Sequence, residues 1–77
     1  MKAYTVVYIK GMEEYARDTY RPGATVKEIV EELTYEINRY HKHCDYITIF
    51  DMNDEADISY FKVVNVDGKY KLIELVW

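Results

Sequence analysis

The clearest alternation of apolar and polar positions lies in residues 26–41 and predicts an amphipathic helix. Apolar residues recur there at steps of three and four, which places them along one side of a helix. They are Val26, Ile29, Val30, Leu33, Ile37 and Tyr40. Thr25 and Glu28 match a capping box, in which a hydroxyl and a carboxylate satisfy backbone donors at a helix start. The opposite side is mainly acidic and is expected to face water, with Glu28, Glu31, Glu32, Tyr35, Glu36 and Arg39.

Two runs before this helix predict a β-hairpin. Residues 4–9 (YTVVYI) are β-branched and aromatic, as in a strand, and they end at Lys10-Gly11. Residues 15–20 (YARDTY) form a weaker, more polar run that would return as the antiparallel partner. Arg21-Pro22-Gly23 then ends the hairpin, because proline cannot join a central ladder and glycine allows a reversal.

The second half of the chain predicts a buried strand and a second hairpin. Residues 46–50 (YITIF) are apolar at nearly every position, as in a central strand covered on both faces or at a tight interface. An acidic loop is expected at 51–57. Asp67-Gly68 is a preferred type I′ turn, which pairs residues 58–66 with residues 69–76.

The predicted second hairpin has two mixed faces. Its register sets Val66 opposite Lys69 and Tyr60 opposite Leu75, and neither face is cleanly polar. An antiparallel hairpin with one wet face should alternate, so a partner or a second copy is expected to cover part of the second face. The alternative is that long lysine and tyrosine side chains shield apolar neighbours within a monomer.

The order strand, strand, helix, strand, strand, strand predicts a single α+β domain over residues 1–77. One helix would pack on a mostly antiparallel sheet of about five strands. The first half, a hairpin followed by a helix that begins Ala-Thr-Val-Lys-Glu-Ile-Val, resembles the opening of a ubiquitin-like β-grasp domain. This resemblance lies in element order alone, and the Glu-Leu-Val-Trp ending differs from the Gly-Gly tail of covalent carriers, so it implies no carrier chemistry.

Composition and charge then narrow the classes of function. Fourteen acidic and ten basic residues give a formal charge of -4, and 16% of the 77 residues are aromatic. These values disfavour a disordered chain and direct binding to nucleic acid, and no apolar run is long enough to cross a membrane. The single cysteine excludes an internal disulfide, and the first eleven residues predict a strand rather than a signal peptide. A cytoplasmic protein is therefore expected.

Two motifs contain residues with potential chemistry, but both favour structural roles. The metal-ligand types cluster at the predicted helix end, in His41, His43, Cys44 and Asp45. No second His/Cys pair follows them, and nothing orients a Cys44 nucleophile, so Cys44 is expected to be a small buried hydrophobe. Residues 51–57 resemble a calcium loop, but Ala56 and Lys62 replace the glycine and the glutamate of an EF-hand. We expect no catalytic residue, metal or cofactor.

The acidic side of the helix is the surface predicted to carry function. Glu28, Glu32 and Glu36 follow at four-residue steps of about 6 Å, close to the spacing of phosphates along a nucleic-acid strand. A purely solubilising surface is the alternative. Tyrosine, which occurs nine times, favours contact with a partner. The residues expected to contact a partner are Glu28, Glu31, Glu32, Tyr35, Glu36, Asp54, Glu55 and Asp57.

These features predict a non-enzymatic, acidic protein-binding module that occupies a basic, nucleic-acid-binding surface of another protein. In size, acidity and tyrosine content the chain is similar to phage-encoded inhibitors of host defence nucleases, including anti-CRISPR and anti-restriction proteins. That resemblance implies a nucleic-acid mimic. The alternative is a homo-oligomer, such as a homodimer, that binds a small molecule or nucleotide between copies, through Tyr60, Ile73, Leu75 and Trp77.

Overall fold

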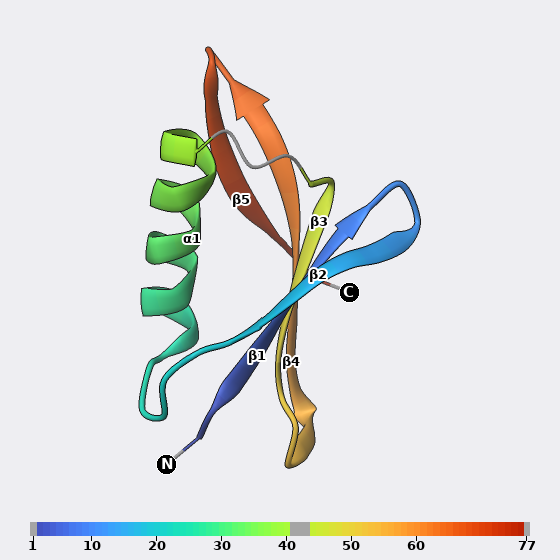
Figure 1. Ribbon diagram of the computed structural model, residues 1–77, viewed down its shortest axis with the longest axis vertical. Helices are drawn as coiled ribbons and strands as arrows, with labels where there is room; N and C mark the ends of the chain where they lie inside the picture. Colours follow the sequence, from blue (N-terminus) through green and yellow to red (C-terminus); the bar gives the residue numbers. More distant parts are fainter. Residues whose placement is uncertain (1, 41–43, 77) are drawn as a thin grey trace.

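The computed structural model describes residues 2–40 and 44–76, except for the side chain of Glu55. Its elements are β1 (Tyr4–Lys10), β2 (Glu13–Thr19), α1 (Val26–Tyr40), β3 (Tyr46–Asp51), β4 (Asp54–Val66) and β5 (Lys69–Leu75). The strands form one sheet in the order β2-β1-β3-β4-β5, with every neighbouring pair antiparallel. Figure 1 shows the helix on one side of this twisted sheet. The predicted α+β architecture is confirmed, including the hairpin that precedes the helix.

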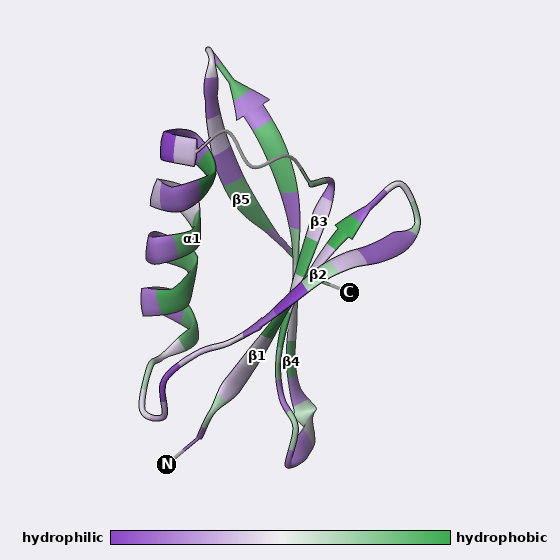
Figure 2. Cartoon of the chain, in the orientation of Figure 1, coloured by the Kyte–Doolittle hydropathy of each residue, from purple (hydrophilic) through white to green (hydrophobic). Residues whose placement is uncertain are grey.

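The core lies between α1 and the sheet. Ile29, Leu33 and Ile37 are almost completely buried, and they share one cluster with Val6 of β1 and Ile49 of β3. Burial of each such side chain contributes about 1.5–3 kcal/mol to folding. Figure 2 shows the apolar side of α1 turned toward the strands and the polar side turned away. The three- and four-residue period is therefore the pattern that fixes the helix to the sheet.

The ends of the helix match the sequence prediction in part. The Thr25 backbone N–H donates to Glu28 Oε1 (3.2 Å), and the Glu28 N–H donates to Thr25 Oγ1 (3.1 Å), so the capping box is confirmed. Tyr40 was predicted on the buried side and is 60% exposed, so that prediction is wrong. It is the last residue of α1, where its ring lies 5.6 Å from the guanidinium carbon of Arg39. His41, the predicted end, lies outside the described residues.

The second hairpin has the predicted register. Val66 is paired with Lys69 and Tyr60 with Leu75. Asp67 and Gly68 have φ values of 52° and 85°, the two left-handed residues that a type I′ turn requires. The predicted acidic loop over 51–57 is shorter than expected because β4 begins at Asp54. Asp51 stabilises this tight turn by accepting a hydrogen bond from the Asn53 N–H (3.0 Å).

The two edges of the sheet differ. On β5, Asn38 of α1 donates to the Tyr70 carbonyl (3.0 Å) and accepts from the Tyr70 N–H (2.8 Å), which occupies backbone groups at that edge. At the other edge, β2 is paired with β1 only. Within residues 2–40 and 44–76, no side chain bonds the outer backbone groups of β2 as Asn38 bonds those of β5.

The centre of the sheet is β3, as predicted from its apolar run, but α1 covers only one of its faces. The face turned away from α1 is called the open face below. In the described part of the chain no other helix covers it, which leaves Ile58, Tyr60 and Ile73 between 37% and 48% exposed. No helix of residues 2–40 and 44–76 is both long enough and apolar enough to cross a membrane.

Candidate functional site

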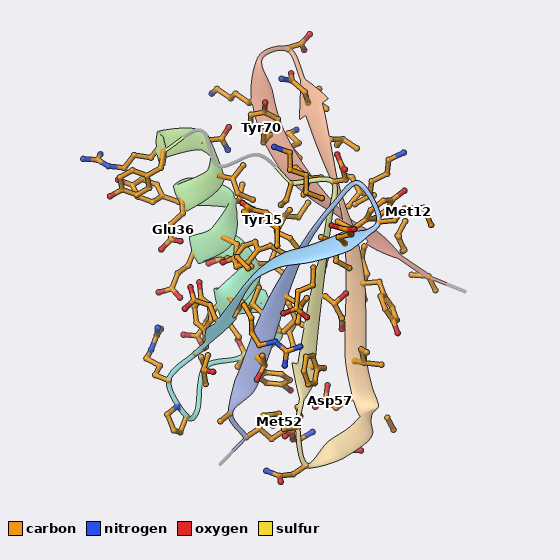
Figure 3. The ribbon with its side chains drawn as sticks, turned by 45° about the vertical axis from the view of Figure 1, so that its right-hand side comes forward. Met12, Tyr15, Glu36, Met52, Asp57 and Tyr70 are labelled. Atoms are coloured by element: carbon orange, nitrogen blue, oxygen red, sulfur yellow. The ribbon has the colours of Figure 1, made fainter. Side chains whose placement is uncertain are left out.

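A groove of about 620 Å³ lies between the end of β2 and the exposed side of α1. We call it the acidic groove, because four of its nine lining residues are carboxylates. Its lining consists of Asp18, Thr19, Tyr20, Arg21, Glu31, Glu32, Tyr35, Glu36 and Tyr40. Figure 3 shows Glu36 projecting outward from α1. Four residues predicted to contact a partner, Glu31, Glu32, Tyr35 and Glu36, are thus brought together here.

The two walls of the groove come from the end of β2, with Tyr20 after it, and from α1. Asp18 is paired with Val6, whose side chain is in the core, so Asp18 lies on the same side of the sheet as α1. Tyr20 follows β2, and its backbone N–H donates to the Tyr4 carbonyl (2.9 Å). Partly buried against the core, the Tyr20 ring forms part of the groove wall. The core stripe of α1 then fixes which glutamates face this wall.

The carboxylates create a negative potential at the Tyr20 ring. Burial is the main cause that raises the pKa of Tyr20 to about 12, and Glu36, Glu32 and Asp18 raise it further. The pKa of Tyr8 is also raised, first by burial and then by groups that include Asp18 and Glu36. Both phenols remain protonated at neutral pH. A site whose carboxylates oppose the ionisation of neighbouring phenols favours a positively charged ligand.

The chain neutralises part of this negative charge itself. Arg21 contacts Glu32 at 3.3 Å and Glu28 at 3.9 Å. The predicted row of evenly spaced glutamates is therefore not a row of unpaired charges, because Arg21 lies against two of its three members. Asp18, Glu31 and Glu36 have no ion pair with any residue that the structure describes. The negative charge available to a partner is thus mainly that of Asp18, Glu31 and Glu36.

Asp54 and Asp57 belong to a different region of the molecule. The Lys2 ammonium contacts both carboxylates, and the Tyr4 hydroxyl donates to Asp57 at 2.7 Å. Hydrogen bonds from Lys2 and Tyr4 lower the pKa of Asp57. Asp54 and Asp57 therefore lie at the start of β1, beside Lys2 and Tyr4, and they do not line the acidic groove. The side chain of Glu55 lies outside the described structure.

Some groove residues were not among those expected to bind. They are Asp18, Thr19, Tyr20, Arg21 and Tyr40. The polar composition of residues 15–20 indicates a strand that is partly exposed, and Tyr15 is 49% exposed. It could not show that Asp18 faces the helix, because that depends on the pairing with β1. The Arg21 contact with Glu32 joins residues eleven positions apart, across a turn.

The candidate metal and nucleophile positions are only partly described. Cys44 is 4% exposed, and burial raises the pKa of its thiol, which confirms its predicted role as a small buried side chain. His41 and His43 lie outside the described residues. Among the residues present in the structure, no three His, Cys, Asp or Glu side chains are grouped so that they could hold a metal ion.

The predicted interface residues Tyr60, Ile73 and Leu75 all lie on the open face. Cross-strand pairing places Tyr60 opposite Leu75 and Lys62 opposite Ile73. A shallow, mainly apolar hollow of about 520 Å³ includes Tyr60 and Leu75 and is completed by Ile9, Tyr46, Ile47, Thr48 and Lys62. Trp77, the fourth predicted residue, is outside the described part of the chain.

Comparison with known proteins indicates no function for the acidic groove or the open face. No protein-family model, curated protein or solved structure matches the chain significantly. Function is therefore inferred from the charge and geometry of the acidic groove and of the open face.

Proposed function

We propose that this protein is a non-enzymatic binding module whose acidic groove takes a basic surface of a partner protein. The observation that carries the proposal is the convergence of Asp18, Glu31 and Glu36 on one groove, unpaired within the described residues. Arg21 beside them balances one charge of the four carboxylates that line the groove. Such excess charge steers a cationic partner toward the site and speeds association.

The tyrosines of the groove supply contact area for the partner's cations. Arg39 shows that such rings bind a guanidinium group within the chain itself. Its guanidinium carbon lies 6.0 Å from the Tyr35 ring and 5.6 Å from the Tyr40 ring. It also donates to the Tyr35 hydroxyl (3.1 Å). Planar guanidinium groups stack on aromatic rings and pair with carboxylates at the same time. An arginine from another protein would pair with the carboxylates of the groove and compete with Arg39 for the Tyr35 and Tyr40 rings.

The β2 edge adjoins the groove and favours an extended ligand segment. Two residues at its end, Asp18 and Thr19, line the groove. Backbone groups on an unpaired edge strand can bind an added strand, while neighbouring pockets select its side chains. An arginine- or lysine-rich segment would meet both the strand edge and the carboxylates.

A basic surface of this kind is common where proteins bind nucleic acid, because lysine and arginine neutralise phosphates. The proposed module would compete with nucleic acid for that surface. An inhibitor of a nuclease, of the kind phage encode against host defence, is the specific form of this proposal. It requires no catalytic residue of its own.

The proposal is tested by affinity capture from a lysate of the native host, at low and high salt. We compare the wild-type chain with E31K/E36K and with E13K/E74K, a matched control outside the groove. Each pair changes the formal charge from -4 to 0, because each substitution adds two charges. The wild type and control should retain a nucleic-acid-binding protein at low salt that E31K/E36K loses, and added DNA should release it.

Two results would overturn this function. One is capture by E31K/E36K of the same partner in the same amount, and the other is a partner that DNA does not displace. Circular dichroism spectra of all three proteins establish that the variants are folded.

A second candidate function is supported by the hollow on the open face. Its apolar lining and the tyrosines at positions 46 and 60 suit a small aromatic ligand held between two copies of the chain. Calorimetry with nucleosides and other planar aromatic compounds tests this candidate. Binding that requires a dimer and is lost in Tyr60→Ala would support it, whereas binding unaffected by that substitution would exclude the hollow.

A further inference from the structure

We propose that the open face packs against the open face of a second copy of this chain, as a two-fold dimer. The surface is distinct from the acidic groove and does not depend on the function assigned to that groove. Strand pairing arranges its side chains in three rows across the sheet. The upper row is Glu14, Ile9, Tyr46, Lys62 and Ile73, the middle row is Arg17, Val7, Thr48, Tyr60 and Leu75, and the lower row is Thr19, Thr5, Phe50 and Ile58.

The composition of the rows is that of a protein interface. The interior of the face is apolar, aromatic or threonine, and charged residues lie mainly toward its margins. Ile73 is 48% exposed, Tyr46 42% and Ile58 39%, although all three are in strands of the sheet. A domain of 77 residues has a small core, and covering these side chains in a dimer adds burial that the monomer lacks.

The size of the face fits a second copy. Three rows extend for about 20 Å along the strands and five strands for about 24 Å across them, or roughly 480 Å² of projected area per copy. Because Thr5, Val7 and Thr48 are already buried in the monomer, two copies would newly bury at most about 1,000 Å², which is near the lower bound for a specific interface. We therefore expect a dimer that forms as concentration rises.

Charge distinguishes the two-fold arrangement with its axis along the strands from the one with its axis across them. An axis parallel to the strands and above β3 places β2 of one copy over β5 of the other and β1 over β4. Glu14 then lies over Ile73 of the second copy, one strand away from its Lys62. Glu14 contacts Arg17 at 2.8 Å in its own chain, whereas Lys62 has no ion pair among the described residues. An axis across the strands would instead set Arg17 over Arg17 of the second copy. The parallel axis is the charge-complementary solution.

Sedimentation velocity over a range of concentrations tests the dimer. The wild type should shift from monomer to dimer, and Ile73→Glu should weaken association at least tenfold. Met52→Glu is the matched control, because Met52 is 70% exposed at the turn between β3 and β4, beyond the three rows (Figure 3). A wild type that stays monomeric at about 1 mM, or equal dimerisation of Ile73→Glu and Met52→Glu, would overturn the proposal.

Cysteine cross-linking tests the axis. Tyr46 lies on β3, under the proposed axis, so Tyr46→Cys in two copies should be joined by a short bismaleimide. Met12→Cys at the tip between β1 and β2 should not be joined (Figure 3). The buried Cys44 makes the wild type the background control. Dimers that cross-link through Met12→Cys and not through Tyr46→Cys would overturn the arrangement.

Discussion

The two faces of the sheet are built from the same strands but have different surroundings. On the face toward α1, Val6, Ile47 and Ile49 are fully buried beneath the helix. On the open face their chain neighbours include Tyr46 and Thr48, and across the strands lie Tyr60 and Lys62. One face is closed by a segment of the chain, whereas the other keeps large apolar side chains within reach of solvent.

This difference assigns folding and the proposed partner binding to the helix side, and the proposed self-association to the open face. The helix supplies the core on its inner side and the acidic groove on its outer side, so folding and the proposed partner binding depend on one element. The open face is buried in the monomer at its centre, at Thr5, Val7 and Thr48, and the exposed apolar side chains around this centre are the ones proposed to associate. The change in the free energy of unfolding caused by a substitution should therefore depend on protein concentration for the open face and not for the helix-covered face.

The largest effect is expected from the helix-covered face. Leu33→Ala removes a side chain that is 1% exposed and should lower the free energy of unfolding by about 2–5 kcal/mol. Ile73→Ala on the open face should cost about 1 kcal/mol or less in dilute solution, because this side chain is half exposed there. Urea denaturation of both variants makes the comparison. Equal losses at low concentration would contradict the separation of the faces.

The next effect concerns the closed edge of the sheet. Asn38→Ala leaves the Tyr70 backbone groups without their side-chain partner, which should cost about 1–3 kcal/mol. Amide hydrogen exchange at Tyr70 should become faster while exchange in β1 changes much less. Unchanged protection of the Tyr70 amide would show that Asn38 does not close this edge.

A smaller loss is expected at the start of the helix. Thr25→Ala removes the acceptor for the Glu28 N–H and should destabilise the protein by about 1 kcal/mol. Thermal unfolding measures the change. Thr25→Ser, which keeps the hydroxyl, is the control and should stay close to the wild type; a loss as large as that of Thr25→Ala would argue against the cap.

The smallest expected effect is the contribution of Asp57 to stability, which is lost at acidic pH. Because Lys2 and Tyr4 lower the pKa of Asp57 in the folded chain, its ionised form stabilises the fold above the ordinary value of 3.8. That contribution is lost as pH falls through the lower folded pKa. Asp57→Asn should reduce stability near neutral pH and flatten the acid branch of the stability curve. A variant whose stability follows the wild-type curve at every pH would contradict this linkage.

The fold was predictable where the determining contacts are local. The three- and four-residue period located α1, Thr25 and Glu28 located its start, and Asp67-Gly68 fixed the second hairpin to the residue. The placement of β3 in the middle of the sheet was consistent with its apolar run. Its pairing with β1 joins segments about forty residues apart, which no local pattern specifies.

The candidate site was predictable only on its helical side. Periodicity placed Glu31 and Glu36 on the outside of α1, but the opposite wall required the pairing of Asp18 with Val6. Two ion pairs also changed the charge that a partner would meet. Arg21 approaches Glu32, and Lys2 binds Asp57 from 55 residues away, contacts that depend on the completed fold.

The most direct test of the proposed function is an NMR titration of the isotope-labelled protein with a short oligoarginine peptide. Backbone shifts should concentrate at Asp18, Tyr20, Glu31 and Glu36 and should weaken as salt rises, while Asp54 and Asp57 change little. Loss of these shifts in E31K/E36K, and their retention in E13K/E74K, would locate cation binding in the acidic groove. Shifts spread evenly over all carboxylates, or centred at Asp54, would contradict the account.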